Sequence, residues 1–456
     1  MLRIGTPAVL ASVLHTAYNL TDAFFVGLLP SGAPQAVMAG IQVSWPFVWF
    51  LVSFIGGFVG AVVTALVAQN LGAQRPEAAN RALNQLFAIS VVSSLVLGFV
   101  GFVAMPLILR AFIHEAEVTE QATRYMRIIF AGLPTMMIPQ LFAGALQATG
   151  NTVTPLLITL VGVGINIPLD AMLVLGLGGA PQLGIGGAAL ATVIAQGVVT
   201  VIFLVLFRRG SGPLRLDRSQ QRVESQWVLR SLEIGIPAAL GNSSVALGFA
   251  FMMTGIGRLE NAVAALSGYG VADRLFGLLF IATDGIGVGL ATMVGQALGA
   301  QDLGRARAVV RSGVRALFFI VLVEAAFVYL ARTSLLQLFI RGDSPGAAES
   351  LREGTRFIEL FAAGMPFLSA FFAVQAVYRG SGHNIPPMVL GILRLWVFRI
   401  PLSYVFAFTL GLGSDGVWLG MSASNVLSGL PALFLLVRGR GWQRSVLDGA
   451  GRERAP

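Results

Sequence analysis

The sequence has no cysteine, no lysine and few charged residues of any kind, since only 11% of its side chains are charged. Without cysteine, neither disulfide bonds nor thiolate metal sites can form. The three histidines, His15, His114 and His383, are too scattered along the chain to form a metal cage. A soluble domain carries about a quarter charged residues, so this composition excludes an ordinary water-soluble fold.

Hydrophobic residues make up 56% of the chain and are gathered into long runs, with a mean hydropathy of +0.80. A helix needs about 20 apolar residues to cross a bilayer core, and the short alternating pattern of an outer-membrane barrel is missing. We therefore predict an all-α integral membrane protein with twelve transmembrane helices. The apolar runs lie near residues 4–28, 36–70, 80–109, 124–147, 153–177, 184–207, 228–256, 262–298, 308–331, 355–378, 386–411 and 415–437. The first run has no A-x-A cleavage site, so we expect no cleaved signal peptide.

All 30 basic residues are arginine, and their positions orient the chain. With the amino terminus inside, the cytoplasmic segments hold 19 arginines and the outer loops hold 8. Because basic residues are enriched on the cytoplasmic side of membrane proteins, both termini are predicted to be cytoplasmic, in a bacterial or archaeal inner membrane. The net charge of +9 is concentrated at membrane edges, so we expect no nucleic-acid partner.

The two halves of the chain repeat one another. Three motifs recur at offsets of 230, 227 and 232 residues: "RIGTPAVL" as "EIGIPAAL", "VAQNLGAQ" as "VGQALGAQ", and "LQATGNTVTP" as "YRGSGHNIPP". Six helices in each half is an even number, so both copies cross the membrane in the same sense, as parallel repeats do. The predicted parts are an amino-terminal six-helix lobe, 1–207; a cytoplasmic linker, 208–227; a carboxy-terminal six-helix lobe, 228–437; and a basic cytoplasmic tail, 438–456.

Two aspartates lie inside the predicted membrane helices of the first half. A charge in hydrocarbon is costly, so an acid at this depth is a candidate functional group. Tyr18 lies one helical turn before Asp22, and Asn166 lies one turn before Asp170, which places each pair on one helix face. Both aspartates lie roughly 10 Å from the outer ends of their helices. Thr192, on the returning helix, lies at a similar depth.

These oxygen-bearing side chains could hold a proton or a hard cation such as Na⁺, for which Asp22, Asn166, Asp170 and Thr192 would be the ligands. Burial disfavours the charged form of a carboxyl group, and a second carboxylate nearby adds to this effect. The pair could therefore take up and release a proton as access to the site alternates. The other interpretation is that each aspartate only hydrogen-bonds Asn or Tyr and locks two helices together.

The second half does not repeat these acids. At the repeat offsets, Asp22 corresponds to Met252 and Asp170 corresponds to Ser403. This half has its own intramembrane charges: Asp273, Arg274, Asp284, Glu324, Glu359, Arg394 and Arg399. Asp273 and Asp284 are eleven residues apart, close to three helical turns, and are expected to share a face. The charges either neutralise one another or bind substrate.

Prolines lie inside several predicted helices, where each removes a backbone hydrogen bond and can bend the helix. Pro7 is on the same helix as Asp22, and its repeat equivalent is Pro237. We therefore expect bending at Pro7 to be coupled to protonation of Asp22. Glycine clusters such as Gly184–Gly187 are typical of close helix packing rather than of phosphate binding.

The ordered set of motifs resembles the multidrug and toxin extrusion (MATE) family. The motifs are "IGTPAVL…YNLTDAFFVG", "VAQNLGAQ" with its echo "VGQALGA", "LQATGNTVTP", "GGAALATV" and "LRLWVFRIPLSYVF", and they extend over nearly the whole chain. The resemblance implies a V-shaped monomeric transporter of two six-helix lobes that works by alternating access. It would export small, drug-like compounds, often cationic or amphipathic, in exchange for H⁺ or Na⁺ and without a cofactor.

Residue by residue, Asp22 resembles the acid of the family's first helix. Pro7 matches the bending proline of the prokaryotic branch named after DNA-damage-inducible protein F. Four residues resemble the amino-lobe polar network of that branch: Tyr18, Asn166, Asp170 and Thr192. NorM-type exporters keep an acid midway along the seventh helix, whereas "GIPAALGNSSVALGFAFM" has none after Glu233. This departure argues against a carboxy-lobe cation site of the NorM type.

A flippase for lipid-linked oligosaccharides, from the same superfamily, is the alternative function. It would also have two lobes, and Arg274, Arg394 and Arg399 could meet a pyrophosphate. The acids of the first lobe would repel that group, however, and a thirteenth and fourteenth apolar run are absent. A membrane enzyme is not expected, because no H-E-x-x-H, G-x-S-x-G or Asp-rich phosphate-metal motif occurs and the repeat would be unexplained.

Overall fold

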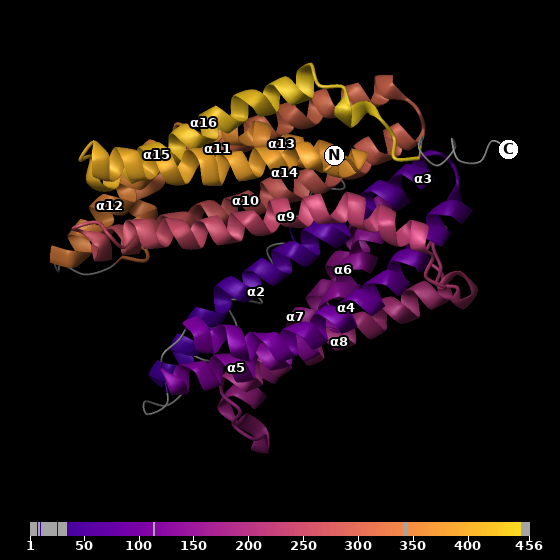
Figure 1. The fold of residues 1–456 in the computed structure, drawn as a ribbon, viewed down its shortest axis with the longest axis horizontal. Helices are drawn as coiled ribbons and strands as arrows, with labels where there is room; N and C mark the ends of the chain where they lie inside the picture. Colours follow the sequence, from indigo (N-terminus) through magenta and orange to yellow (C-terminus); the bar gives the residue numbers. More distant parts are fainter. Residues whose placement is uncertain are drawn as a thin grey trace. The chain divides into compact units, whose positions relative to one another are not determined.

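The chain folds into long α-helices joined by short loops (Figure 1). The computed structural model describes Pro7, Leu10, Phe25 and residues 34–112, 115–340 and 345–447. In these ranges nine helices are long and apolar enough to cross a membrane, or eleven if each of two bent helix pairs is one span. The eleven coincide with the predicted runs from 36–70 onwards, while the run 4–28 lies almost wholly outside the described residues. An isolated bridge is the only β-type pairing in the described part of the chain, so the all-α prediction is confirmed.

The helices of the first half are interrupted in two places. α2 (Pro34–Val63) continues through a π-helical turn, Thr64–Ala68, into the short α3 (Gln69–Gly72). α5 (Ala116–Ala131) and α6 (Leu133–Ala148) form one bent span. The uninterrupted helices are α4 (Pro76–Phe112), α7 (Val153–Leu175) and α8 (Ile185–Arg209).

The second half also has one bent span and one irregular helix, but its irregular helix is the one before α16. α9 (Ser225–Ile256), α10 (Ala262–Gly299), α11 (Leu303–Gln337) and α16 (Gly413–Val437) are continuous. α12 (Pro345–Ala362) and α13 (Met365–Ser381) form the second bent span. The helix before α16 is assembled from α14 (Ile385–Ile392), the π-helical η4 (Leu393–Arg399), α15 (Ile400–Tyr404) and the π-helical η5 (Val405–Thr409).

Equivalent positions of the two halves share an unusual backbone geometry. Gln74 and Gln301, which end the two copies of the "LGAQ" motif, both have a φ of 56°. They are the only non-glycine residues with positive φ in the ranges that the structure describes. A left-handed glutamine is uncommon, so finding it at both repeat positions indicates that the same turn follows the helix in each half.

Each half also contains a span that bends at a glycine, with a proline two residues later. α5 and α6 meet at 48° around Gly132, and α12 and α13 meet at 63° around Gly364. Pro134 and Pro366 begin the second helix of each pair, where a missing N–H breaks no helical bond. A Cβ at Gly132 would lie 2.3 Å from a side chain of α8, and one at Gly364 would lie 2.7 Å from a carbonyl oxygen of α16. A side chain at either position would therefore overlap the neighbouring helix, so the close packing at both bends requires glycine.

The linker between the halves is held against the start of α4 by two side-chain amides. Asn84 Nδ2 donates to the carbonyl oxygen of Arg215 at 2.9 Å, and Asn84 Oδ1 accepts from the backbone N–H of Asp217 at 2.8 Å. Gln85 Nε2 donates to two further linker carbonyl oxygens, both at 2.8 Å. These bonds satisfy backbone groups that have no strand or helix partner of their own. The linker is therefore an ordered part of the first half.

Two further contacts shape this segment. Arg81 Nη2 donates to Glu224 Oε1 at 2.7 Å. Asp217 begins a short 3₁₀ turn, η3 (Arg218–Gln220), and accepts from the Ser219 hydroxyl at 2.7 Å and from its backbone N–H at 2.9 Å. These hydrogen bonds from Ser219, the hydroxyl first, lower the pKa of the Asp217 carboxyl group.

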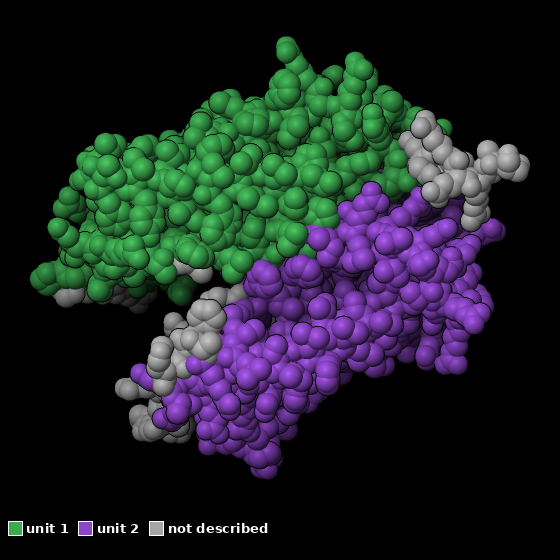
Figure 2. Space-filling view, in the orientation of Figure 1, with its two compact units in different colours: residues 1–9, 237–456 green, residues 10–236 purple. Residues whose placement is uncertain are grey.

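By packing, the chain divides into two compact units (Figure 2). One unit comprises residues 1–9 and 237–456, and the other comprises residues 10–236. The division falls inside α9, at the peptide bond before Pro237, which cannot donate a helical hydrogen bond. Each unit has a hydrophobic core of its own.

Large apolar side chains cover the outside of several helices. Phe99 on α4 is 71% exposed, and Phe319 and Leu330 on α11 are 61% and 79% exposed. An extensive apolar surface is unfavourable in water, but it matches the hydrocarbon around a helix whose backbone groups are satisfied internally. The outer surface is therefore that of a membrane protein.

Candidate functional site

In the first half, the predicted polar residues of α7 lie inside the protein. Asn166 and Asp170 are one turn apart, and both side chains are completely buried. Pro168 lies between them and cannot donate to the carbonyl group four residues earlier, so the helix is weakened beside both side chains. Neither amide atom of Asn166 has a hydrogen-bond partner within the described ranges. A buried polar group without a partner is unusual, which makes this part of α7 a candidate binding site.

Thr192 lies on α8, the helix that packs beside α7, and is 8% exposed. Glycines permit the close approach of these two helices. A Cβ at Gly187 would lie 2.2 Å from the carbonyl oxygen of Leu173, and one at Gly162 would lie 2.7 Å from the Val199 side chain. The two helices therefore present their buried polar residues from adjacent backbones.

Asp22 and Tyr18, which the sequence places with this group, lie outside the described residues, as does His15. Pro7 is described and is helical and half-buried. The proposed cation ligands can therefore be compared with the structure only for Asn166, Asp170 and Thr192. Among the residues that the structure describes, no group of three or more His, Asp or Glu side chains could hold a metal ion.

In the second half, two arginines are buried on the π-helical segment η4. Arg394 is 6% exposed and Arg399 is 2% exposed. Arg399 Nη2 donates to Asn425 Oδ1 at 2.7 Å and its Nε donates to Ser424 Oγ at 3.0 Å. Arg394 Nη1 donates to the same Asn425 oxygen at 3.4 Å. Both guanidinium groups therefore converge on one neutral amide oxygen of α16.

Aromatic rings complete the surroundings of these arginines. The Arg394 guanidinium carbon lies 4.4 Å from the centre of the Phe371 ring, and that of Arg399 lies 5.8 Å from the centre of the Phe361 ring. Such cation–π contacts favour the charged arginine in an apolar setting. Tyr269 stacks on Trp418 nearby, with ring centres 5.5 Å apart.

The other charges of the predicted carboxy-lobe network fall into separate groups. The Tyr269 hydroxyl donates to Asp273 Oδ1 at 3.3 Å, and Asp273 interacts electrostatically with Arg399. Arg274, the next residue, is exposed. Within the described ranges, Asp273, Arg274 and Arg399 form no ion pair.

Asp284 and Glu324 form a second group further along α10. The hydroxyl of Thr283 donates to Glu324 Oε2 at 3.3 Å, and the other oxygen, Oε1, is buried without a hydrogen-bond partner among the described residues. Asp284 interacts electrostatically with Glu324 and with Arg379 of α13. This group therefore links α10 with its neighbours α11 and α13.

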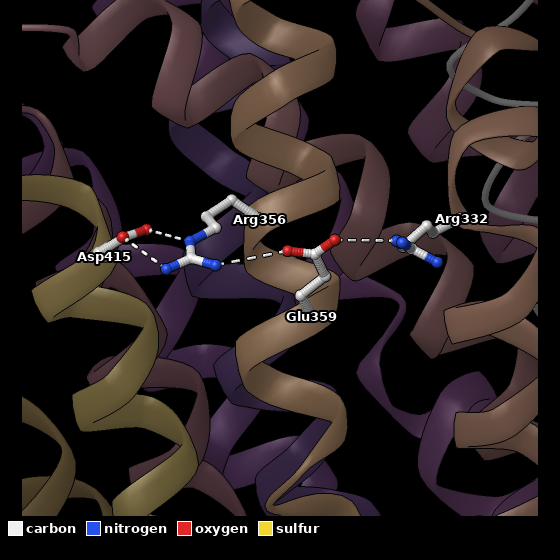
Figure 3. Close-up of polar contacts among 4 residues, drawn as sticks. All are labelled: Arg332, Arg356, Glu359 and Asp415. Carbon is white, nitrogen blue, oxygen red and sulfur yellow. Dashed lines mark hydrogen bonds and ion pairs between the residues drawn. The ribbon is translucent and has the colours of Figure 1, made fainter.

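Glu359 belongs to an ion-pair chain that joins three helices (Figure 3). Its carboxylate accepts from Arg332 Nε at 3.1 Å and from Arg356 Nη1 at 3.5 Å. Arg356 also makes two bonds to Asp415, at the start of α16. These side chains are 28–47% exposed, so this chain ties α11, α12 and α16 together near the surface.

Sequence reasoning did not identify Ser424 and Asn425 as partners of the buried arginines. The signal was present as "SASN" at residues 422–425, a polar stretch inside an otherwise apolar run. Ser424 and Asn425 are both completely buried. Buried polar residues in membrane helices commonly hydrogen-bond across helices, so this stretch could have been paired with the arginines of the preceding helix.

Two repeated helical halves in a membrane, with polar groups buried in each, are the architecture of a secondary transporter. The MatE family profile matches residues 7–172 and 237–405, one segment in each half and more than half of the chain. The chain therefore belongs to the MatE (MATE) family, as the sequence motifs predicted. It is a multi-pass bacterial membrane transporter and not an enzyme. Its assignment to the branch named after DNA-damage-inducible protein F stays a prediction.

Proteins similar to this chain match it over almost their full length. The "Probable multidrug resistance protein NorM" of Thermotoga maritima is 27% identical, with 98% of this chain and 94% of that protein covered. The "Multidrug resistance protein MdtK" of Photorhabdus laumondii is 22% identical, with 94% and 93% covered.

Solved structures share the fold. A MATE protein crystallised with MaL6 has a TM-score of 0.87 at 21% identity and covers 96% of this chain and 95% of its own. A MOP superfamily transporter from Pyrococcus furiosus also has a TM-score of 0.87 at 21% identity, with 97% and 96% covered. At this identity the likeness establishes the fold, and the predicted fold class is confirmed.

Proposed function

We propose that the protein is a secondary antiporter that exports small, drug-like compounds, often cationic or amphipathic, in exchange for H⁺ or Na⁺. Support for the substrate class comes from the similar proteins of Thermotoga maritima and Photorhabdus laumondii, which are named for multidrug resistance. The observation that carries the coupling part is the complete burial of Asn166 and Asp170 one turn apart on α7. The ion is the only cofactor in this proposal.

The chemistry follows from burial. A carboxyl group away from water favours its protonated form unless a cation neutralises it. Asp170 can therefore exchange a proton or Na⁺ with whichever side of the membrane reaches it, and Asn166 and Thr192 supply neutral oxygen atoms beside it. We place Asp22 and Tyr18 in the same site, and we assign to Pro7 the bending that opens and closes it.

The domain boundaries and orientation are part of the same proposal. Six-helix lobes at 1–207 and 228–437 flank the linker at 208–227, and the tail at 438–456 is basic. The excess of arginine in the linker and tail favours the cytoplasm for both termini. The protein would act as a monomer, because each copy of the chain already supplies both repeats.

The test is ethidium efflux from sealed lipid vesicles containing the purified protein, under an imposed pH gradient or an imposed Na⁺ gradient. Wild type is compared with Asp22→Asn, Asp170→Asn and the control Glu260→Gln, which removes an exposed carboxylate outside the apolar runs. We expect one gradient to drive efflux, Asp22→Asn and Asp170→Asn to reduce it at least tenfold, and Glu260→Gln to leave it unchanged.

The gradient that drives efflux identifies the coupling ion. Efflux that survives both aspartate substitutions would contradict the amino-lobe site, but it would leave the antiport function supported. If wild type moves no dye under either gradient, multidrug export loses its support, and movement of polyprenyl lipids across the bilayer should be measured instead.

A further inference from the structure

The buried arginines of the second half carry more positive charge than the surrounding residues neutralise. Arg394 and Arg399 share one hydrogen-bond acceptor, the neutral Oδ1 atom of Asn425. Asp273 is the acid that interacts electrostatically with Arg399. The electrostatic neighbour of Arg394 is Arg399 itself. Of these two buried guanidinium groups, only that of Arg399 therefore interacts with a carboxylate in the described part of the chain.

The polar atoms left without partners at this place are donors. Arg394 Nε and Asn425 Nδ2 are buried with no hydrogen-bond acceptor in the described part of the chain. Arginine and the amide nitrogen of asparagine offer only N–H groups. Their natural complement is a group that only accepts hydrogen bonds, such as a halide or a carboxylate.

The backbone and the aromatic side chains around Arg394 and Arg399 are suited to binding a ligand. Arg394 and Arg399 lie on η4, a π-helical segment within a membrane span, and π-helical segments occur frequently at functional sites. The Phe371 ring covers one face of the Arg394 guanidinium. An apolar wall keeps water away, so attraction between a guanidinium group and an anion is stronger there than in water. Arginine also presents its donors in a planar fork that matches a carboxylate.

We propose that the second half binds one compact anion at Arg394, Arg399 and Asn425. The anion is either a small free ion such as chloride or the carboxylate of a transported compound, since both present the same acceptor chemistry. The second possibility rests on the proposed export function and extends its substrates to zwitterionic compounds. Anion binding itself is independent of export and can be measured without a gradient.

The test uses the purified full-length protein in lipid nanodiscs and isothermal titration calorimetry. Sodium chloride and sodium acetate are titrated separately at constant ionic strength, with the sodium salt of HEPES, a bulky sulfonate, as the balancing salt. We expect saturable binding of at least one of the two anions with one site per chain. Arg394→Gln should weaken it at least tenfold, whereas Arg258→Gln, which removes an exposed arginine from the same unit, should not change it.

A second variant separates loss of the site from loss of the fold. Asn425→Asp places a carboxylate against both guanidinium groups, so the protein should melt at the same or a higher temperature while no longer binding the anion. Absence of saturable binding in wild type would overturn the proposal. Equal weakening of anion binding by Arg258→Gln and Arg394→Gln would also overturn the proposal. The same conclusion would follow if Asn425→Asp bound the anion as tightly as wild type.

The two sources of the anion are distinguished by competition. Binding of acetate that chloride does not displace assigns the site to a substrate carboxylate, and displacement in both directions assigns it to compact anions in general. Because no dye and no gradient are involved, failure of ethidium efflux leaves this result unaffected. Failure of anion binding likewise leaves the antiport proposal at Asp22 and Asp170 standing.

Discussion

Arg356 and Asp415 form a two-bond ion pair between α12 and α16 (Figure 3). Arg356 Nε donates to Asp415 Oδ1 at 2.8 Å, and Arg356 Nη2 donates to Asp415 Oδ2 at 2.9 Å. The parallel geometry matches the planar guanidinium to the carboxylate and is stronger than a single contact. It joins the start of the last membrane helix to α12, the first helix of a bent span.

Removing this pair should cost little stability, because both side chains are partly exposed. We expect Asp415→Asn to lower the free energy of unfolding by about 0.5–1 kcal/mol, measured by thermal unfolding in detergent. Exchanging the charges, with Arg356→Asp and Asp415→Arg together, should recover part of the loss. Arg352→Gln is the matched control, because Arg352 is exposed on the same helix and makes no ion pair within the described ranges. A loss as large for Arg352→Gln would show that the pair itself contributes nothing.

The hydrogen bonds between the Asn84 side-chain amide and the linker predict that the linker becomes less ordered when this amide is removed. Asn84→Ala removes the acceptor and donor that hold Asp217 and Arg215, so trypsin should cleave after linker arginines several times faster than in wild type. Cleavage is followed on protein in detergent by gel electrophoresis. Asn151→Ala is the control, because Asn151 bonds to Thr154 at the start of α7 and does not contact the linker. Equal cleavage rates in Asn84→Ala and wild type would mean that the Asn84 hydrogen bonds do not order the linker.

Close packing of α16 against the preceding irregular helix predicts unequal effects of two glycine substitutions. A Cβ at Gly420 would lie 2.5 Å from the backbone nitrogen of Ser403, whereas one at Gly270 meets nothing within 4 Å. Gly420→Ala should therefore destabilise the protein by about 1–3 kcal/mol through overpacking. Gly270→Ala should be neutral or stabilising by up to about 1 kcal/mol, because alanine favours the helix. Thermal unfolding of the two purified variants checks both values, and a Gly420→Ala variant as stable as Gly270→Ala would contradict the close approach.

The absence of cysteine makes the proposed orientation easy to measure. A single cysteine at Arg218→Cys, in the linker, should react with a membrane-impermeant maleimide only after intact cells are permeabilised. A single cysteine at Glu260→Cys, in the loop between α9 and α10, should react in intact cells. Both residues are exposed, so accessibility depends on the side of the membrane alone. The reverse labelling pattern would place the linker outside and overturn the cytoplasmic assignment of both termini.

The membrane class, the helical runs and the duplication could be predicted from sequence because each depends on local or periodic properties. An apolar run long enough to cross a bilayer has few alternatives to a helix. The repeat offsets likewise anticipated that Gln74 and Gln301 would occupy equivalent positions, although not that both would be left-handed. Glycines before the bends, such as Gly132 and Gly364, are visible in the sequence, but the angles of 48° and 63° are not.

The partners of the buried charges were decided by tertiary structure. Periodicity indicates which residues share a helix face, but not which neighbouring helix that face meets. The sequence by itself determined that Arg394 and Arg399 would be intramembrane charges, and it left open whether acids neutralise them or substrate does. Packing of η4 against α16 brought Asn425, 26 positions beyond Arg399, into contact with both guanidinium groups. A neutral amide in that position is a consequence of helix packing, because only the packed helices bring those side chains within hydrogen-bond distance.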